Sequence, residues 1–312
     1  MKQPKITLFI STSMAFPIVQ QLIQRQQLAG VVLTARVDAD SMQLEQQLQH
    51  MQLPFIRYNE QDTQPTIHFI QTLSSQLGLI ATFTHILPEA LLSCFSLGLY
   101  NVHASLLPAY RGANPLFWQL KNNEKESAVL IHKVEKTADT GGIVASYKFD
   151  IHPLDTFGTL SGSVFQVMPL VINEFLDLIA EHGQAIARTE QQGEVCQAPQ
   201  PSQQDVSIDW SSMTASEICA LARACNPNLG GAQLRWKSAQ IGLMQANVVD
   251  KPMFGVPAGT IMHIGAPEGL LVATKEFALC IDVVYMMDGV FSGLQFAERF
   301  SLNAGEKFLN QV

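Results

Sequence analysis

The sequence predicts an α/β protein with two domains, in which a mainly parallel sheet flanked by helices is followed by a smaller β-barrel. Three observations predict this architecture. Short apolar runs alternate with longer amphipathic runs through roughly the first 180 residues, as in parallel sheets covered by helices. Several short β-like runs then follow in the second half. The length of 312 residues also exceeds the usual size of one hydrophobic core.

The first predicted domain begins with a strand, because the apolar run at residues 6–10 is short and the polar loop 11–13 follows it. Further apolar runs predict strands at residues 31–34, 79–83, 99–103, 128–134 and 143–151. Amphipathic runs between them predict helices at residues 14–29, 41–51, 67–77, 88–93 and 160–182. Pro88 suits the first turn of its short helix, where no backbone N–H is needed.

The second predicted domain follows a segment with the composition of a linker. Residues 190–206, EQQGEVCQAPQPSQQDV, are rich in Gln and Pro and have no apolar period. We therefore expect one domain at residues 1–189 and a second at 207–312. Thr214 and Glu217 form a predicted capping box before a helix. Five strand-like runs then predict the barrel, at residues 233–236, 239–248, 259–264, 270–274 and 279–285.

Composition narrows the class of protein. Charged residues make up 15% of the chain and the net charge is −8, which argues against a nucleic-acid partner held by a broad field of Lys and Arg. The five cysteines contain no C-x-x-C pair, so we expect reduced thiols in a cytoplasmic protein, with no disulfide framework and no metal site. The apolar start is interpreted as a strand rather than a signal peptide, and no apolar run approaches the ~20 residues of a membrane span.

Two hydrogen-bonding side chains, Asn101 and His103, end the predicted strand at 99–103. Alternation along a strand places them on one face, and ligands of open α/β sheets collect at the carboxyl ends of the strands. Asp139, in the loop TADTGG, reaches the imidazole if that loop returns to the same sheet edge. Asn then supplies a donor for an oxyanion, His a second donor or a general base, and Asp fixes the His tautomer.

No Ser or Cys is placed as a nucleophile beside these three residues, so the pattern suits direct attack by a substrate amine on a bound acyl carbon. Each residue also has an ordinary structural explanation. A His at a strand end often has a satisfied hydrogen bond, and Asn or Asp beside Gly commonly forms turns. Spacing alone does not bring the three residues together.

Several segments resemble one family. NVHASLLPAYRGANP at 101–115, followed by ADTGGIV at 138–144, resembles the signature of 10-formyltetrahydrofolate-dependent formyltransferases. HILPEALL at 85–92 resembles the pterin-side loop of that family, and IDWSSMTASEICALARACNP at 208–227 resembles the start of its C-terminal domain. The resemblance covers nearly the whole chain. It implies a Rossmann-like formyltransferase domain followed by an OB-like β-barrel domain.

The resemblance also implies the site and its chemistry. Asn101, His103 and Asp139 would be the catalytic residues, in transfer of the formyl group from N10 of 10-formyltetrahydrofolate to a primary amine. No metal is implied. Arg111 is either a contact for an anionic group or a structural cap over its loop. The residues implied to bind the folate are Phe83, Ile86, Leu87, Ser105, Leu106, Leu107, Pro108 and Lys136.

The acceptor amine is the point at which the sequence departs from one branch of the family. Methionyl-tRNA formyltransferases carry a basic, Gly- and Arg-rich insertion after the second strand, whereas this chain has TARVDADSMQLEQQ there, with one Arg and three acidic residues. From Gln204 onward, seven Lys and Arg stand against ten Asp and Glu. A phosphate backbone gains little from this balance. We therefore expect a small-molecule amine, such as an amino sugar or a hydroxylated ornithine.

Three alternatives remain open from the sequence. The first is a true methionyl-tRNA formyltransferase, and the second is a folate-binding protein without turnover. The third is a hydrolase that passes the formyl group to water. The complete set of Asn101, His103 and Asp139 argues against loss of turnover. A second domain would have little purpose in a hydrolase that needs no acceptor.

Overall fold

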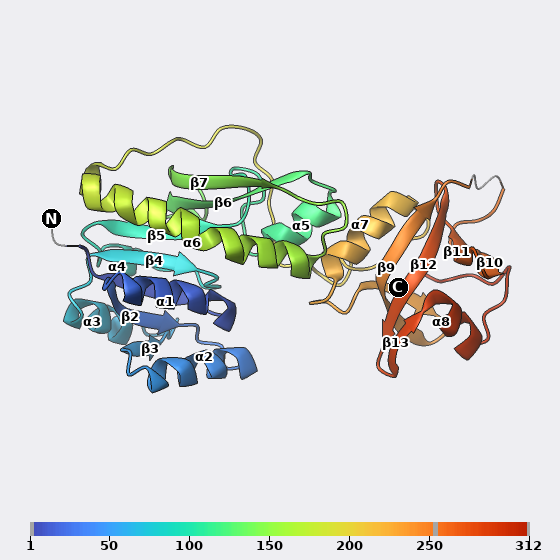
Figure 1. Ribbon diagram of the computed structural model, residues 1–312, viewed down its shortest axis with the longest axis horizontal. Coiled ribbons are helices and arrows are strands. Elements are labelled where there is room, and N and C mark those ends of the chain that lie inside the picture. The colour runs from blue at the N-terminus through green and yellow to red at the C-terminus, as the bar shows by residue number, and fades with distance from the viewer. Residues whose placement is uncertain (1–2, 252–254, 311–312) are drawn as a thin grey trace. The chain divides into compact units, whose positions relative to one another are not determined.

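The computed structural model describes residues 3–251 and 255–310 (Figure 1). The chain divides into two compact units. The first contains the chain up to Ala113 together with Ser127–Phe149 and Ser163–Gln197. The second contains Asn114–Glu126, Asp150–Gly162 and the chain from Ala198. The domain limits at residues 189 and 207 stay a prediction.

The first unit is built on a seven-stranded sheet with the order β3-β2-β1-β4-β5-β6-β7. Strands β1 to β5 pair in parallel and β6 runs antiparallel to β5. The order reverses direction between β1 and β4, as in Rossmann-like sheets, so the predicted α/β class is confirmed. The strands are β1 Ile6–Ile10, β2 Leu28–Leu33, β3 Phe55–Arg57, β4 Leu77–Ala81, β5 Gly98–His103, β6 Glu126–Lys133 and β7 Ile143–Asp150.

Helices cover both faces of this sheet. The helical segments between residues 13 and 185 are η1 Ser13–Ala15, α1 Phe16–Gln24, α2 Ala39–His50, α3 Gln64–Thr72, α4 Glu89–Leu92, α5 Pro115–Lys121, α6 Phe157–His182 and η2 Gly183–Ala185. Of these, α5 and the start of α6 belong to the second unit. On one face α1 and α6 are joined, because Gln21 Nε2 donates to the Pro169 carbonyl at 2.8 Å. On the other face Ile70 of α3 and Leu91 of α4 share a buried cluster with Leu99 of β5. The carboxyl end of β5 therefore emerges between two packed layers.

Helix α6 is long and apolar enough to cross a membrane by length and composition alone. Core helices of soluble proteins pass the same test. The helix is packed like one of them, since Phe175 is fully buried and its ring lies 4.8 Å from that of Tyr100 on β5.

Several element boundaries differ from the prediction. The helix expected to reach residue 29 ends at Gln24, because Gln26 adopts a left-handed φ of 57° and β2 starts at Leu28. The predicted helix 67–77 and strand 79–83 both begin earlier, as α3 and β4. The prediction also missed several elements, among them β3, α5, β13 and α8. Strand β3 has three residues, too few to show alternation, and α5 has seven residues that directly follow the NVHASLLPAYRGAN motif.

The second unit contains a six-stranded antiparallel sheet with the order β10-β11-β12-β9-β8, and β13 pairs with β12. Lys307 and Leu309, near the end of the chain, form bridges to Thr260 beside β10 and to Arg235 in β8. These isolated bridges extend the pairing at β8 and beside β10, and the predicted second, antiparallel β domain is confirmed. The elements are α7 Ala215–Cys225, β8 Ala232–Trp236, β9 Ala239–Val249, β10 Ile261–Gly265, β11 Gly269–Ala273, β12 Ala278–Met286, β13 Gly289–Ser292 and α8 Gly293–Arg299.

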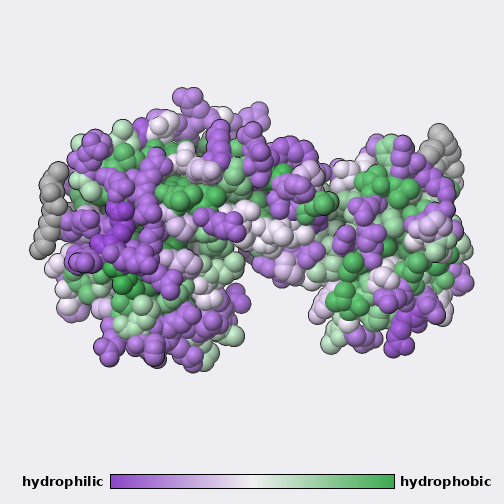
Figure 2. All heavy atoms as spheres, in the orientation of Figure 1, coloured by the Kyte–Doolittle hydropathy of each residue, from purple (hydrophilic) through white to green (hydrophobic). Residues whose placement is uncertain are grey.

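Local structure in the second unit agrees with what its sequence predicts. The predicted capping box is present, since Thr214 Oγ1 accepts from the Glu217 N–H and the Glu217 carboxylate accepts from the Thr214 N–H. Trp210 stacks on Phe308 with ring centres 5.6 Å apart, and the two rings fill the core of the unit. On the face shown in Figure 2, apolar groups reach the surface in separate patches among polar side chains.

Candidate active site

The carboxyl end of β5 carries the first two predicted catalytic residues. Its sequence GLYNVH alternates, so Leu99, Asn101 and His103 share one face while Tyr100 packs on the other. Leu99 belongs to the buried cluster beneath α4, and His103 is only 5% exposed. Asn101 lies directly opposite His132 of β6. Asn101 and His103 therefore lie beside buried apolar side chains at the end of the strand.

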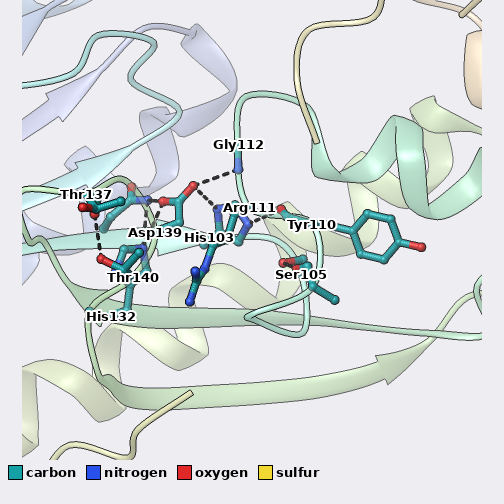
Figure 3. A network of polar contacts seen from close by, with 12 residues as sticks. His103, Ser105, Tyr110, Arg111, Gly112, His132, Thr137, Asp139 and Thr140 are labelled. Carbon is teal, nitrogen blue, oxygen red and sulfur yellow. Dashed lines mark hydrogen bonds and ion pairs between the residues drawn. The ribbon is translucent and has the colours of Figure 1, made fainter. Parts of the chain in front are cut away.

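The loop between β6 and β7 brings Asp139 to this pair (Figure 3). Asp139 has a left-handed φ of 54°. Its carboxylate accepts a hydrogen bond from Asn101 Nδ2 at 3.3 Å and another from the Gly112 N–H at 2.9 Å. Its Oδ2 lies 3.9 Å from His103 Nδ1. The three residues that the sequence singled out are thus brought together.

Close packing fixes the return of this loop. A Cβ at Gly141 would lie 1.9 Å from the Lys133 carbonyl oxygen, so a side chain at this position collides with the end of β6. The Lys133 N–H also donates to the Gly142 carbonyl at 3.0 Å. The glycines of TADTGG are therefore required by the approach of the loop to the sheet.

The Asp139 carboxylate is kept ionised. Its burial raises the pKa, but the hydrogen bond with His132, the charges of the two histidines and the Gly112 N–H outweigh that effect and bring the pKa to about 2. A permanent negative charge therefore lies beside the rings of His103 and His132 at neutral pH.

His103 has a fixed tautomer. Its Nε2 lies 3.0 Å from the Tyr110 carbonyl oxygen, which can only accept, so Nε2 carries the proton. In the neutral ring Nδ1 then has a free lone pair that faces Asp139. Burial lowers the pKa of His103 from its usual 6.5, and the charge of Asp139 offsets part of this shift. The ring is therefore neutral at pH 7, and Nδ1 is available to take a proton.

The tautomer was expected to be fixed by Asp139, and the Tyr110 carbonyl does so instead. The separation of 3.9 Å between His103 Nδ1 and Asp139 is beyond hydrogen-bonding distance. Asp139 is nevertheless close enough to stabilise a positive charge that forms on the ring.

His132 is a site residue that the sequence reasoning missed. Its Nδ1 lies 2.9 Å from the Lys133 carbonyl, and its Nε2 is 3.3 Å from both Asn101 Nδ2 and Asp139 Oδ1. The available signal was a histidine directly after the apolar run AVLI, within a predicted strand. Its meaning depends on the antiparallel register of β5 and β6, which the sequence does not reveal.

The residues expected to bind the folate lie in different surroundings. Phe83 packs edge-to-face on Phe9, with ring centres 5.6 Å apart, and Leu87 is buried in the same core. Ile86 is 77% exposed. Lys136 is exposed and its Nζ lies 3.0 Å from the Glu89 carboxylate.

The SLLP segment closes as a tight turn, because Ser105 Oγ donates to the Ala109 carbonyl at 2.7 Å. Leu107 and Pro108 are buried and Leu106 is partly exposed. The turn is followed by Tyr110, whose carbonyl oxygen lies 3.0 Å from His103 Nε2.

A cavity of about 430 Å³ opens beside α4, the start of β5 and the loop that follows β6. Its size is within the usual range of small-molecule sites. Leu92, Phe95, Leu99 and Val134 contribute apolar lining. The charged side chains of the lining are Glu89, Lys133, Glu135, Lys136 and Arg188. Of the residues expected to contact folate, Lys136 lines this cavity.

Comparison with protein families assigns the chain to a family. The sequence pattern described as formyl transferase matches residues 5–174, which is more than half of the chain. This chain belongs to the formyl transferase family. The pattern of the formyl transferase C-terminal domain also matches, at residues 201–298. The resemblance to formyltransferases is therefore confirmed, and the chain is assigned to a family of enzymes that catalyse formyl transfer.

Curated relatives support the assignment. The methionyl-tRNA formyltransferase of Dictyoglomus thermophilum is 33% identical over 245 residues, covering 77% of this chain and 77% of the relative. That of Nitrosomonas europaea is 29% identical over 242 residues, covering 77% of this chain and 74% of the relative.

Solved structures share the fold. A formyltransferase from Helicobacter canadensis, in complex with folinic acid and dTDP-3-aminofucose, has a TM-score of 0.67 at 15% identity, covering 92% of this chain and all of that one. The sugar 3N-formyltransferase WlaRD, with dTDP and 5-N-formyl-THF, has a TM-score of 0.66 at 16% identity, covering 89% and 97%. HypX from Aquifex aeolicus, in complex with tetrahydrofolic acid, has a TM-score of 0.61 at 14% identity and covers 98% of this chain, which spans about half the length of HypX.

Proposed function

We propose that this formyl transferase family member transfers the formyl group of 10-formyltetrahydrofolate to the primary amine of a small molecule, and that Asn101, His103 and Asp139 are its catalytic residues. The observation that carries the proposal is their convergence. An amide donor, a neutral imidazole and an ionised carboxylate meet at one sheet edge, with His103 Nδ1 and Asp139 Oδ2 3.9 Å apart. This set suits acyl transfer that needs no enzyme nucleophile.

In the proposed reaction, the neutral amine attacks the formyl carbon, and the carbonyl π electrons move to the formyl oxygen. Asn101 Nδ2, whose hydrogen bond to Asp139 is long at 3.3 Å, exchanges that bond for one to this oxyanion, and a well-placed donor of this kind contributes about 3 kcal/mol. His103 Nδ1 takes the proton of the attacking nitrogen, while Asp139 stabilises the imidazolium. The imidazolium donates to the oxyanion and then gives its proton to N10 as the C–N10 bond breaks. The products are a formamide and tetrahydrofolate.

The donor is proposed from the ligands of solved structures of the same fold, which hold tetrahydrofolic acid or 5-N-formyl-THF. The cavity beside α4 is not assigned to the folate, because none of Asn101, His103 and Asp139 lines it. Phe83, Ile86, Leu87, residues 105–108 and Lys136 are proposed as the folate contacts. No metal takes part in the proposed reaction.

The proposed acceptor is a nucleotide-linked amino sugar, and the connection between β2 and α2 supports a small molecule. Arg36 in this connection and Arg57 of the adjacent β3 are both engaged. Arg36 Nε lies 3.0 Å from Asp38, and Arg57 donates to Glu45 at 2.5 Å and to the Thr34 carbonyl at 3.2 Å. A phosphate backbone would have to displace these carboxylates. Methionyl-tRNA is the second candidate, because the curated relatives named above are methionyl-tRNA formyltransferases.

The two acceptors are distinguished by direct assay. The protein is given 10-formyltetrahydrofolate with either dTDP-linked amino sugars or initiator methionyl-tRNA, and formylated product is quantified at several salt concentrations. We expect the amino sugar to be formylated, with a weak dependence of rate on salt. Formylation of tRNA alone, at a rate that falls steeply with salt, would replace the proposed acceptor.

We further propose that the enzyme acts in the cytoplasm and that residues 190–206 connect the two domains. The free cysteines agree with a reducing compartment, and burial raises the pKa of the Cys225 thiol to about 12, so that it is unreactive at neutral pH.

A further inference from the structure

We propose that Gln191 is a positioning residue for the reaction, holding together the two loops that carry the catalytic groups. The inference rests on the proposed function, because it assigns Gln191 a role toward His103 and Asp139. From composition, Gln191 was predicted to belong to a linker. In the structure its side chain makes four hydrogen bonds within the first unit.

One end of the Gln191 amide holds the loop of Asp139. Its Nε2 donates to the Asp139 carbonyl at 2.9 Å and to the Gly141 carbonyl at 2.9 Å. Both hydrogens of the amide nitrogen are therefore used. These bonds fix the backbone on each side of Thr140, at the point where Asp139 has its left-handed φ of 54°. The direction of the Asp139 carboxylate depends on that backbone.

The other end of the amide holds the loop after β5. Gln191 Oε1 accepts from Arg111 Nη2 at 2.5 Å and from Arg111 Nε at 3.2 Å. Arg111 lies between Tyr110, whose carbonyl accepts from His103, and Gly112, whose N–H donates to Asp139. A single side chain thus connects the partner of His103 to the backbone of Asp139 (Figure 3 shows Arg111, Gly112 and Asp139 in this arrangement).

The main chain around Gln191 is itself anchored. Thr189 and Ile143 exchange backbone hydrogen bonds of 2.8 and 2.9 Å at the start of β7. Further on, the Arg111 N–H donates to the Cys196 carbonyl at 3.1 Å, and the Tyr110 N–H donates to Cys196 Sγ at 3.1 Å. The backbone on both sides of Gln191 is therefore held in place. Forming the side-chain hydrogen bonds of Gln191 then costs little additional conformational entropy.

The positioning role has a consequence for catalysis. Loss of the Gln191 amide leaves two carbonyls and one guanidinium without their partner, so the two loops are free to separate. A misplacement of about 1 Å at a reacting group reduces rates by roughly 10²-fold. The side-chain hydrogen bonds of Gln191 reach Arg111, Asp139 and Gly141, and none of the proposed folate contacts. We therefore expect kcat to fall while KM for the folate is retained.

The test uses three variants of the full chain. Gln191→Ala removes all four hydrogen bonds. Gln191→Glu keeps the acceptor for Arg111 but replaces the donor by an oxygen that repels the carbonyls of Asp139 and Gly141. Gln192→Ala is the matched control, because Gln192 is the same residue type at the next position and is exposed.

Two measurements are made on each variant. The first is amide hydrogen exchange without substrate, at Gly112 and in residues 139–142. The second is kcat and KM with 10-formyltetrahydrofolate and the dTDP-linked amino sugar. In both Gln191 variants, we expect faster exchange at these amides only and a loss of about 10²-fold in kcat. Their KM for the folate and their unfolding midpoint should equal those of Gln192→Ala. Unchanged exchange at Gly112 would overturn the inference, and so would faster exchange throughout the protein.

The exchange measurement does not depend on the acceptor. If the parent formylates no amine, the proposed function fails while local exchange still reports whether Gln191 holds the loops. If the parent is active, and Gln191→Ala shows the same amide exchange and the same kcat as Gln192→Ala, the positioning role of Gln191 is rejected while the proposed function stands.

Discussion

The end of β5 and the aromatic core of the second unit are both buried, but they are built from opposite chemistry. At the end of β5, His103, His132 and Asp139 are enclosed within a few ångströms of one another. In the second unit Trp210, Phe296 and Phe308 are fully buried with stacked rings. Burial of titratable groups shifts their pKa, whereas burial of rings contributes free energy of folding. The comparison teaches that substitutions at the end of β5 should change the reaction rate, whereas substitutions in the aromatic core should change the free energy of unfolding.

The largest expected effect is the loss of the base. His103→Ala removes Nδ1, and we expect kcat to fall by roughly 10²–10⁴-fold, the usual contribution of general acid-base catalysis. The second unit contains all three tryptophans, Trp118, Trp210 and Trp236. Its unfolding, followed by tryptophan fluorescence, should be the same in His103→Ala and parent. A variant with the kcat of the parent would contradict the role given to His103.

Truncation of the aromatic core should produce the opposite result. Phe308→Ala removes a ring that is 1% exposed and lies against Trp210 and Trp236, so we expect the free energy of unfolding to fall by about 3–5 kcal/mol. Urea titration of tryptophan fluorescence measures this loss. At temperatures where the variant is folded, its kcat should remain that of the parent. A selective loss of kcat in the folded variant would break the comparison.

The loop of Asp139 offers an intermediate test. Gly141→Ala places a Cβ 1.9 Å from the Lys133 carbonyl, so the loop must shift and kcat should fall by roughly 10²-fold. Gly162→Ala is the control, because a Cβ there meets nothing within 4 Å and the position is helical. Steady-state kinetics of the two variants should differ. Equal values would show that the loop has room to adapt.

The pH dependence of kcat should respond to the two neighbours of His103 in opposite directions. The base must be unprotonated, and its folded pKa is lowered from 6.5, so the acidic limb of kcat lies below pH 6.5. Asp139 raises the pKa of His103, so Asp139→Asn should move the limb to lower pH while reducing kcat. The charge of His132 lowers that pKa, so His132→Gln should move the limb to higher pH. Rate profiles between pH 5 and 8 that shift in the same direction in both variants would exclude His103 as the titrating base.

The smallest effect is expected at Trp210. Its indole N–H is buried and no hydrogen-bond partner is found for it among the described residues. Trp210→Phe removes this unpaired donor together with some apolar contact, so the two contributions oppose each other. The free energy of unfolding should change by less than about 1 kcal/mol. Calorimetry against Phe308→Ala measures the difference, and a loss as large as in that variant would mean that the indole N–H is satisfied.

The sequence predicted the features that depend on local pattern. The period of two in LYNVH placed Asn101 and His103 on one face, and TADTGG marked a loop that returns to the sheet. Residues whose role depends on tertiary contact were not recognised. His132 acts through the register of β5 and β6, and Gln191 lies in a segment whose composition is that of a linker. Strand β3 was too short for its alternation to be seen.

The central claim is that the residues at the end of β5 transfer a formyl group to an amine. The most direct measurement follows ¹³C-labelled formyl from 10-formyltetrahydrofolate by NMR, with the full chain and a dTDP-linked amino sugar. We predict that the label appears in a formamide in the presence of the parent and remains on the folate in the presence of His103→Ala. Label that appears as formate, or remains on bound folate with every amine supplied, would contradict the claim.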